Sequence, residues 1–308
     1  MRLFSILLAL VLVLAVACSS GGGESGDGAS DDDGAAFDDS APVGDRSASG
    51  DGSATGDTSS NGDATPNGVY IALGDSLSEG VGASDQTATA FVPLVHDGLG
   101  EGWDLVNLGE AGDTSAQLIG HGHLDEAIAL IEAGKSDDDP DNDVNLVTLE
   151  IGGNDLLNLF FDLVLPGACP SLVESLERPQ CVSELRGAMD GFRPNLEQTL
   201  DRLIEADPEL RIIVMTLYNP FSGDTGLATV PTISDMAQMA LEGLPDTPFA
   251  TGLNDTIRDE VAERGLPLVD WWPLFQDKAG QYIAQDYIHP NDAGYRVMAD
   301  AVLEQVAE

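Results

Sequence analysis

The sequence predicts an α/β protein, a three-layer α/β/α sandwich around a five-stranded parallel sheet. Short apolar runs bounded by turn residues recur along the chain, and segments with helical spacing of apolar residues separate them. This alternation is typical of a parallel sheet that helices cover on both faces. The five expected strands are Val69–Leu73, Leu105–Leu108, Val144–Ile151, Arg211–Leu217 and Leu266–Trp271.

Between these runs, apolar residues recur at intervals of three and four, which predicts amphipathic helices. The recurring positions are Leu124, Ile128 and Ile131, then Leu196, Leu200, Leu203 and Ile204, then Ile257 and Val261, and finally Tyr295, Met298, Val302 and Val306. Asn291 stands where it can cap the last helix. Because parallel strands carry their working loops at their carboxyl ends, the loops after Leu73, Leu108, Ile151 and Leu217 are expected at one edge.

The chain of 308 residues divides into three parts by composition. Residues 1–18 have Arg2, an apolar run and then Cys18, which is typical of an export signal and too short to span a membrane comfortably. Ala15-Val16-Ala17-Cys18 resembles a bacterial lipobox, which implies acylation of Cys18 and an anchor on the outer face of the membrane. An ordinary cleaved signal, leading to secretion, is the alternative.

Residues 19–67 are rich in Gly, Ser and Asp and predict a disordered, self-repelling tether. Residues 68–308, about 240 residues, suit one domain with a full core.

The formal net charge of -42 argues against nucleic acid as a partner, because phosphates need Lys and Arg. It equally disfavours docking to anionic lipid. We expect a monomer.

Two cysteines remain in the body of the chain, Cys169 and Cys181. In an exported protein they are expected to form a disulfide, which would restrain a polar, proline-containing insertion over about residues 162–182. Two free buried thiols are the alternative. Two thiols alone do not complete a zinc site, and we expect neither a metal nor a cofactor.

Residues suited to acyl chemistry stand at three strand ends. The first strand leads into Gly74-Asp75-Ser76-Leu77-Ser78, which would expose the Ser76 hydroxyl and its backbone N–H at a helix start. The second leads to a loop in which Gly112 could present its N–H to a ligand. The third leads to Gly152-Gly153-Asn154-Asp155, where Asn154 offers an amide donor. Taken singly, each pattern is more typical of an ordinary turn or helix cap.

A base for Ser76 is available near the C-terminus, in Asp286-Tyr287-Ile288-His289-Pro290. Serine needs an adjacent base to act as a nucleophile, and histidine titrates near neutrality. Asp286, three residues earlier, could hold the imidazole of His289 in the required tautomer. The chain has four histidines. His121 and His123 lie in a polar connection, where solvated loop histidines are expected and metal binding is the alternative.

Four blocks in this order, Gly-Asp-Ser-Leu-Ser, Gly-Asp-Thr-Ser, Gly-Gly-Asn-Asp and Asp-x-x-His-Pro, resemble the SGNH hydrolases, also called the GDSL family. The resemblance covers the body from Val69 to Val306 and implies a flavodoxin-like sheet and metal-free ester hydrolysis. By that likeness Ser76 is the nucleophile, and Asp286 and His289 complete the triad. Gly112 and Asn154 join the Ser76 N–H as oxyanion donors.

The expected function is serine-dependent hydrolysis of a small-molecule, lipid or carbohydrate ester through an acyl-enzyme, as in esterases and lipases. A carbohydrate O-acetyl esterase is the main alternative, because an acetyl group needs only a shallow pocket, whereas a lipase needs an apolar groove. The stretch Leu156–Leu165, with Phe160 and Phe161, could line such a groove or simply form a buried helix. An inactive surface binding protein is a further alternative.

Overall fold

The structure is a computed structural model that describes residues 68–308 apart from 137–138, 165 and 224–230. The predicted signal, Cys18 and the tether therefore lie outside the described residues. A five-stranded sheet with the order β2-β1-β3-β4-β5 forms its centre, and every strand pairing is parallel. The strands are β1 (Gly68–Gly74), β2 (Trp103–Asn107), β3 (Val144–Glu150), β4 (Arg211–Met215) and β5 (Leu268–Val269).

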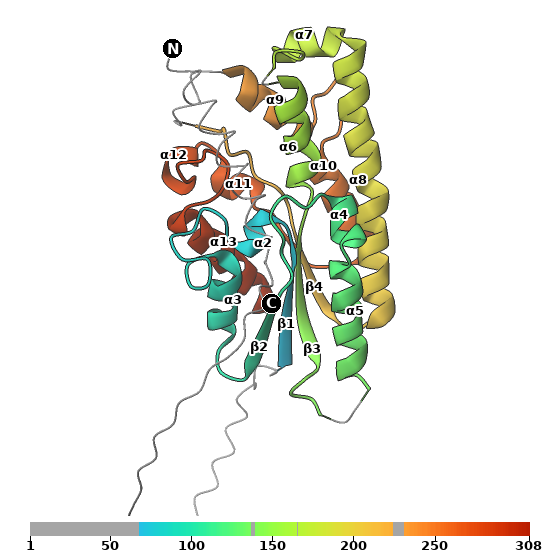
Figure 1. The fold of residues 1–308 in the computed structure, drawn as a ribbon, viewed down its shortest axis with the longest axis vertical. Helices are drawn as coiled ribbons and strands as arrows, with labels where there is room; N and C mark the ends of the chain where they lie inside the picture. The colour runs from blue at the N-terminus through green and yellow to red at the C-terminus, as the bar shows by residue number, and fades with distance from the viewer. Residues whose placement is uncertain (1–67, 137–138, 165, 224–230) are drawn as a thin grey trace, which may run out of the picture.

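Helices cover both faces of the sheet, which confirms the three-layer α/β/α prediction (Figure 1). One layer contains α4 (Ser115–Gly120), α5 (His123–Gly134), α8 (Pro179–Ala206) and α10 (Leu253–Arg264). The other contains α3 (Phe91–Leu99), α11 (Trp272–Phe275) and α13 (Asp292–Val306). As predicted, the Asn291 side chain caps α13 by accepting hydrogen bonds from the N–H groups of Ala293 and Gly294.

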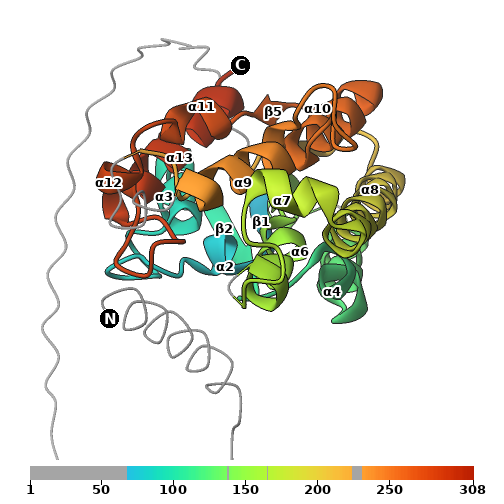
Figure 2. The same ribbon diagram turned by 90° about the horizontal axis from the view of Figure 1, so that it is seen from above.

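Six further elements lie in the segments that follow the carboxyl ends of the strands. These are α2 (Ser76–Glu79), α6 (Gly153–Leu159), the π-helical turn η1 (Phe160–Val164), α7 (Leu172–Glu177), α9 (Pro231–Glu242) and α12 (Ala279–Tyr282). Figures 1 and 2 place α2, α6, α7 and α9 together beyond this edge of the sheet. Helices therefore cover the edge of the sheet that the carboxyl ends of the parallel strands form.

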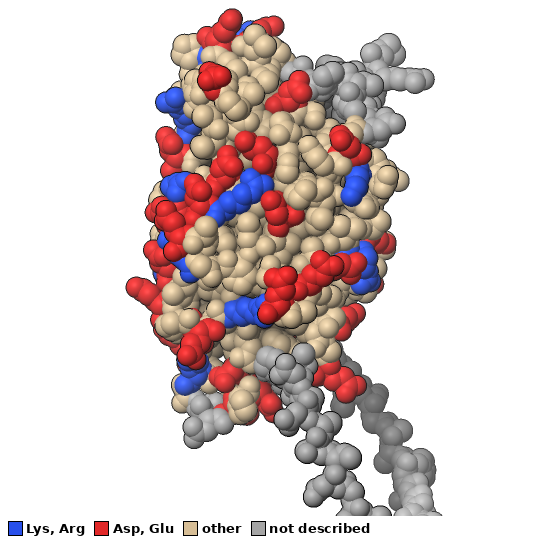
Figure 3. Space-filling view, turned by 180° about the vertical axis from the view of Figure 1, so that it is seen from behind, with Lys and Arg blue, Asp and Glu red and all other residues tan. Residues whose placement is uncertain are grey.

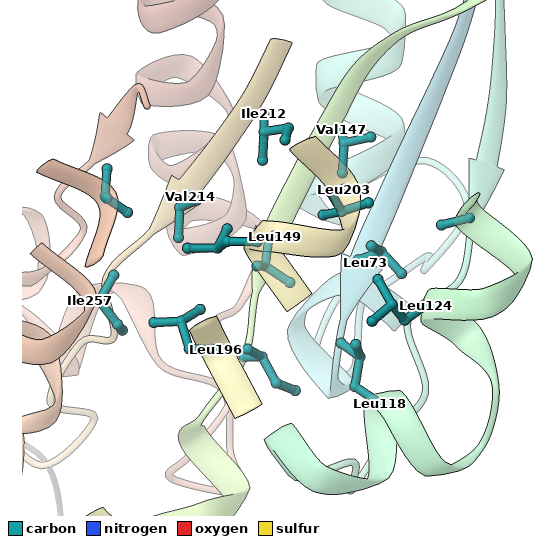
Figure 4. Close-up of a cluster of buried hydrophobic side chains, with 14 of the residues drawn as sticks. Leu73, Leu118, Leu124, Val147, Leu149, Leu196, Leu203, Ile212, Val214 and Ile257 are labelled. Carbon is teal, nitrogen blue, oxygen red and sulfur yellow. The ribbon is translucent and has the colours of Figure 1, made fainter. Parts of the chain in front are cut away.

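The sheet separates two hydrophobic clusters, one under each helical layer. In the first, Leu73 and Leu149 from the strands pack against Leu196 and Leu203 of α8, and all four side chains are almost fully buried (Figure 4). The second includes Phe91 and Tyr295, whose rings stack with centroids 6.5 Å apart. Burial of such side chains on both faces explains why the strands read as continuous apolar runs.

The last strand is shorter than predicted. Its pattern predicts a strand over Leu266–Trp271, but only Leu268–Val269 pairs with β4. Helix α11 begins at Trp272, directly after the buried Trp271, and Pro273 stands in its first turn. Proline is well placed there and cannot donate to a sheet, so the chain leaves the sheet early.

Cys169 and Cys181 form the predicted disulfide, which ties the segment before α7 to the first turn of α8. The insertion that it closes is less polar than the sequence suggests. Leu163, Leu176 and Val182 point into a cavity described below. Their spacing does not follow one helical face, because three different elements supply them.

Acidic side chains are spread over the surface, and the few basic side chains lie beside them (Figure 3). Arg258, for example, lies 3.0 Å from Glu242 and 3.1 Å from Asp270. Arg264 contacts Asp201 at 2.7 Å.

Within the described residues, no helix has the length and apolar character needed to cross a membrane.

Candidate active site

The predicted nucleophile and base meet at the carboxyl edge of the sheet. His289 Nε2 lies 2.9 Å from Ser76 Oγ, and the opposite ring nitrogen, Nδ1, lies 2.7 Å from Asp286 Oδ2. Ser76 and His289 are 213 positions apart in the sequence, so the fold alone brings them together. The arrangement has the hydrogen-bonding order of a serine–histidine–aspartate triad.

The turn from β1 into α2 exposes Ser76. A side chain at Gly74 would lie 2.3 Å from the Ser78 hydroxyl and 2.4 Å from the Glu150 carbonyl oxygen, so only glycine fits there. Asp75 caps the helix by accepting a hydrogen bond from the Leu77 N–H at 3.1 Å. Ser76 is then the first helical residue, and within the described chain its backbone N–H donates no hydrogen bond.

Asp286 organises the loop that carries His289. Its Oδ1 accepts hydrogen bonds from the N–H groups of Ile288 and His289, both at 3.0 Å. Tyr287, between Asp286 and Ile288, adopts a φ of 66°, an uncommon conformation for a residue with a side chain. Burial acts to raise the pKa of Asp286, but the hydrogen bond and charge of His289 outweigh it and lower that pKa. Asp286 therefore stays ionised at neutral pH and holds the His289 ring with Nε2 facing Ser76 Oγ.

Asn154 lies in the first turn of α6 and joins two neighbouring loops. Its Nδ2 donates to Asp75 Oδ2 at 3.0 Å and to the Asp113 carbonyl oxygen at 2.9 Å. Both amide hydrogens are thus engaged, a feature that the sequence did not predict. Donation to an oxyanion requires that one of these bonds be shared or exchanged when substrate binds.

Gly112 lies in the loop after β2, next to the Asp113 carbonyl that Asn154 binds. Its φ of 93° is left-handed, and a side chain there would meet nothing within 4 Å. The conformation, and not the space, therefore requires glycine. Its N–H donates no hydrogen bond among the described residues. A second link holds this loop, because Asp155 accepts from both the backbone N–H and the hydroxyl of Ser115, at 2.8 and 2.7 Å.

A cavity of about 160 Å³ opens beside Ser76 and His289. Apart from the residues around Ser76 and His289, and the hydroxyl groups of Ser175 and Tyr218, its walls are apolar. Helices α6, α7, α8 and α9 and the turn η1 supply most of them. Phe160 stacks on Phe221 with ring centroids 5.6 Å apart. The sequence allowed two interpretations of the stretch that begins at Leu156: the wall of a groove or a buried helix. The structure shows a cavity wall as far as Val164, because residues of α6 and η1 line the cavity and none of them is fully buried.

A pair of buried carboxyl groups lies under the nucleophile, and sequence reasoning missed it. Glu150, at the end of β3, is fully buried, and within the described residues neither of its carboxyl oxygens has a hydrogen-bond partner. Burial and the nearby charge of Asp75 raise the pKa of Glu150 well above its usual value. Burial also raises the pKa of Asp75 to about 6. The only signal in the sequence was a glutamate inside an apolar strand.

Replacement of Glu150 with glutamine is expected to stabilise the protein at neutral pH but not in acid. A raised pKa means that the folded state holds the proton more tightly than the unfolded chain. This contribution is complete below pH about 4.5. Between that pH and the raised folded pKa it is lost by about 1.4 kcal/mol per pH unit, because only the unfolded chain has released the proton there. Unfolding in urea from pH 4 to pH 8 measures the difference between Glu150→Gln and wild type.

The stability difference should grow with pH over this range. Glu126→Gln, on an exposed face of α5, is the matched control and should show no such trend. A Glu150→Gln difference that is the same at pH 4 and pH 8 would contradict a neutral, buried Glu150.

Comparisons with known proteins identify the family of this chain. Residues 72–297 match the model of the GDSL-like Lipase/Acylhydrolase family. The chain is 22% identical over 238 residues to the spore germination lipase LipC of Bacillus licheniformis, covering 75% of this chain and 92% of that one.

Solved structures share the fold. The lipase Lip_vut3 from a goat rumen metagenome has a TM-score of 0.56 and 19% identity, over 78% of this chain and 97% of its own. Phospholipase A1 from Streptomyces albidoflavus has a TM-score of 0.52 and 17% identity, over 78% and 99%. The family match extends from within β1 to within α13, and this chain therefore belongs to the GDSL-like lipase/acylhydrolase family and is an ester-bond hydrolase.

Proposed function

We propose that Ser76, His289 and Asp286 carry out hydrolysis of carboxylic esters with medium or long apolar acyl chains. His289 Nε2 takes the Ser76 proton as Oγ attacks the ester carbonyl carbon. The imidazolium then gives that proton to the leaving alcohol, and an acyl-enzyme remains. Water, deprotonated by the same nitrogen, attacks the acyl carbon and releases the acid and free Ser76.

The negative charge of each tetrahedral intermediate needs donors in place before the reaction. The backbone N–H groups of Ser76 and Gly112 have no other partner among the described residues, and the Asn154 amide is held close by Asp75 and Asp113. We assign these three groups to the oxyanion hole. The two backbone donors are fixed in place and cost no reorganisation during the reaction. The Asn154 amide must share or exchange one of its two hydrogen bonds to reach the oxyanion.

The observation that supports a lipolytic substrate is the apolar cavity beside Ser76 Oγ. An acetyl group would leave most of that surface exposed to water, whereas each buried CH₂ of a longer acyl chain gains about 0.8 kcal/mol. Leu157, Phe160 and Leu163 line the cavity and are only partly covered by protein. An acyl chain can therefore complete their burial.

The test is turnover of p-nitrophenyl esters from acetyl to palmitoyl. We expect kcat/KM to rise from acetyl to an optimum at medium or long chains. Ala237, on α9, lines the cavity, and Ala237→Phe should lower kcat/KM for the preferred chain at least tenfold while acetate turnover changes little. Gln238→Phe places the same ring on the exposed neighbouring position and serves as the control.

A steep preference for acetyl esters in wild type would contradict the lipolytic assignment and favour the carbohydrate deacetylase. An Ala237→Phe variant with an unchanged chain-length profile would show that the acyl chain binds elsewhere. Neither result touches the roles of Ser76 and His289, which have their own test below.

We also propose that the protein works outside the cytoplasm. Support comes from the Cys169–Cys181 disulfide, since such bonds form and persist in oxidising compartments. The export signal and the acylation of Cys18 fall on residues outside the described part. Mass spectrometry of the N-terminal peptide from membrane fractions tests the lipid anchor.

A further inference from the structure

Four metal-ligating side chains gather beside the oxyanion loop, outside the cavity. Glu110 and Asp113 come from the turn after β2, and His121 and His123 from the junction of α4 and α5. One ligand atom from each lies within 4.8 Å of all the others. The sequence favoured solvated loop histidines here, but the structure gives both histidines carboxylate partners. None of the four residues lines the cavity that contains Ser76.

The two histidine nitrogens contact both oxygens of each carboxylate, at distances that bracket the ligand–ligand separation around a tetrahedral ion. His121 Nδ1 lies 2.9 Å from Asp113 Oδ1 and 3.9 Å from Glu110 Oε1. His123 Nε2 lies 2.8 Å from Glu110 Oε2 and 3.5 Å from Asp113 Oδ2. Ligands at the usual zinc distances of about 2.0–2.2 Å would stand about 3.3–3.6 Å apart. Small side-chain movements would bring all four atoms to that separation.

Asp113 supplies an independent sign that a cation belongs here. Its side chain is only 2% exposed, yet Oδ2 has no hydrogen-bond partner among the described residues. A buried carboxylate oxygen without a partner is costly, and an imidazole at 3.5 Å does not satisfy it. An ion between Asp113 and His123 would do so.

The backbone holds the four groups in place without an ion. Gly122, between the two histidines, has a φ of 92°, and the two imidazole rings stand edge to face with centroids 6.1 Å apart. On the other side, the Asp113 N–H donates to the Glu110 carbonyl at 3.1 Å, and Glu79 of α2 accepts from the Ala111 N–H at 2.7 Å. A site that is largely formed in advance loses little entropy on binding.

We propose that Glu110, Asp113, His121 and His123 bind one Zn²⁺ ion, which fixes the loop that carries Gly112. Two imidazoles and two carboxylates suit zinc or a similar transition ion, whereas Ca²⁺ and Mg²⁺ prefer oxygen ligands alone. The ion touches no reacting atom. It acts on the oxyanion hole through position, because Asp113 follows Gly112 directly and its carbonyl accepts from Asn154.

The test is Zn²⁺ binding to the full chain by calorimetry and metal analysis, in excess Ca²⁺ so that ordinary carboxylate sites are filled. We expect one equivalent of Zn²⁺ per chain and a rise in Tm of about 5–10 °C when free Zn²⁺ is a hundredfold above Kd. His121→Gln with His123→Gln should abolish both effects. His96→Gln is the matched control, since the His96 ring contacts the Trp103 carbonyl oxygen far from the site, and it should bind as wild type does.

Two measurements on the wild-type chain keep the test decisive if the double variant fails to fold. Co²⁺ should give the visible absorption bands of a four-coordinate ion, and Zn²⁺ should protect His121 and His123 from diethylpyrocarbonate. Absence of the Co²⁺ bands, modification of both histidines at the same rate with and without Zn²⁺, or full Zn²⁺ binding by a folded double variant would each overturn the proposal. All these readouts are independent of ester hydrolysis.

Discussion

Replacement of Ser76 with alanine is expected to lower kcat for ester hydrolysis by about 10⁴–10⁶-fold. Without Oγ no acyl-enzyme forms, and only transition-state stabilisation by the remaining donors is left. The change removes one small hydroxyl whose nearest partner is His289 Nε2 at 2.9 Å, so the fold should persist. Steady-state kinetics on a p-nitrophenyl ester measures the loss.

Ser78→Ala is the matched control for this substitution. Ser78 lies on the same short helix and is fully buried, but its hydroxyl contacts the Leu73 carbonyl oxygen and not His289. A fluorophosphonate probe should label wild type and Ser78→Ala but not Ser76→Ala. Ser76→Ala protein with more than a tenth of wild-type turnover, or labelling that persists in it, would mean that another residue is the nucleophile.

Replacement of Asn154 with alanine is expected to lower kcat by about 10²–10³-fold with little change in KM. A donor that binds the developing oxyanion more strongly than the substrate carbonyl acts on kcat and kcat/KM equally. The Asp75 and Asp113 contacts of Asn154 also disappear, so unfolding must be measured on the same protein. The kinetic loss should exceed anything that a shift in Tm explains at the assay temperature.

Asn158→Ala, one turn further along α6 and exposed, is the control and should behave as wild type. Wild-type kcat in folded Asn154→Ala would remove this residue from the oxyanion hole. A rise in KM with unchanged kcat would instead place the amide in ground-state binding.

Much of the candidate site followed from local sequence signals. Gly74 before Ser76, and Asp286 three residues before His289, are short-range patterns whose geometry neighbouring backbone atoms dictate. Because parallel strands end at one edge, the order of the blocks was enough to predict that these loops converge. The five strands were predictable for a similar reason, since burial on both faces leaves a continuous apolar run.

Other features depend on contacts between segments that are distant in the sequence. Five elements supply most of the cavity walls, and no single periodicity marks the residues that face it. The Glu150–Asp75 pair arises because β1 and β3 are adjacent, which sets Gly74 beside Glu150. The zinc-type cluster depends on the left-handed turn at Gly122, which aims two histidines at a loop about ten residues earlier.

The amino-acid sequence by itself determined the fold class, the contacts among Ser76, His289 and Asp286 and the family resemblance, because each rests on local patterns repeated in a fixed order. Only the tertiary structure decided which groups the Asn154 amide donates to and which residues surround the cavity beside Ser76. It also decided that carboxyl oxygens of Glu150 and Asp113 are buried without a hydrogen-bond partner among the described residues. The physical reason is that burial and electrostatic environment are set by packing between elements, and packing is a property of the folded chain as a whole.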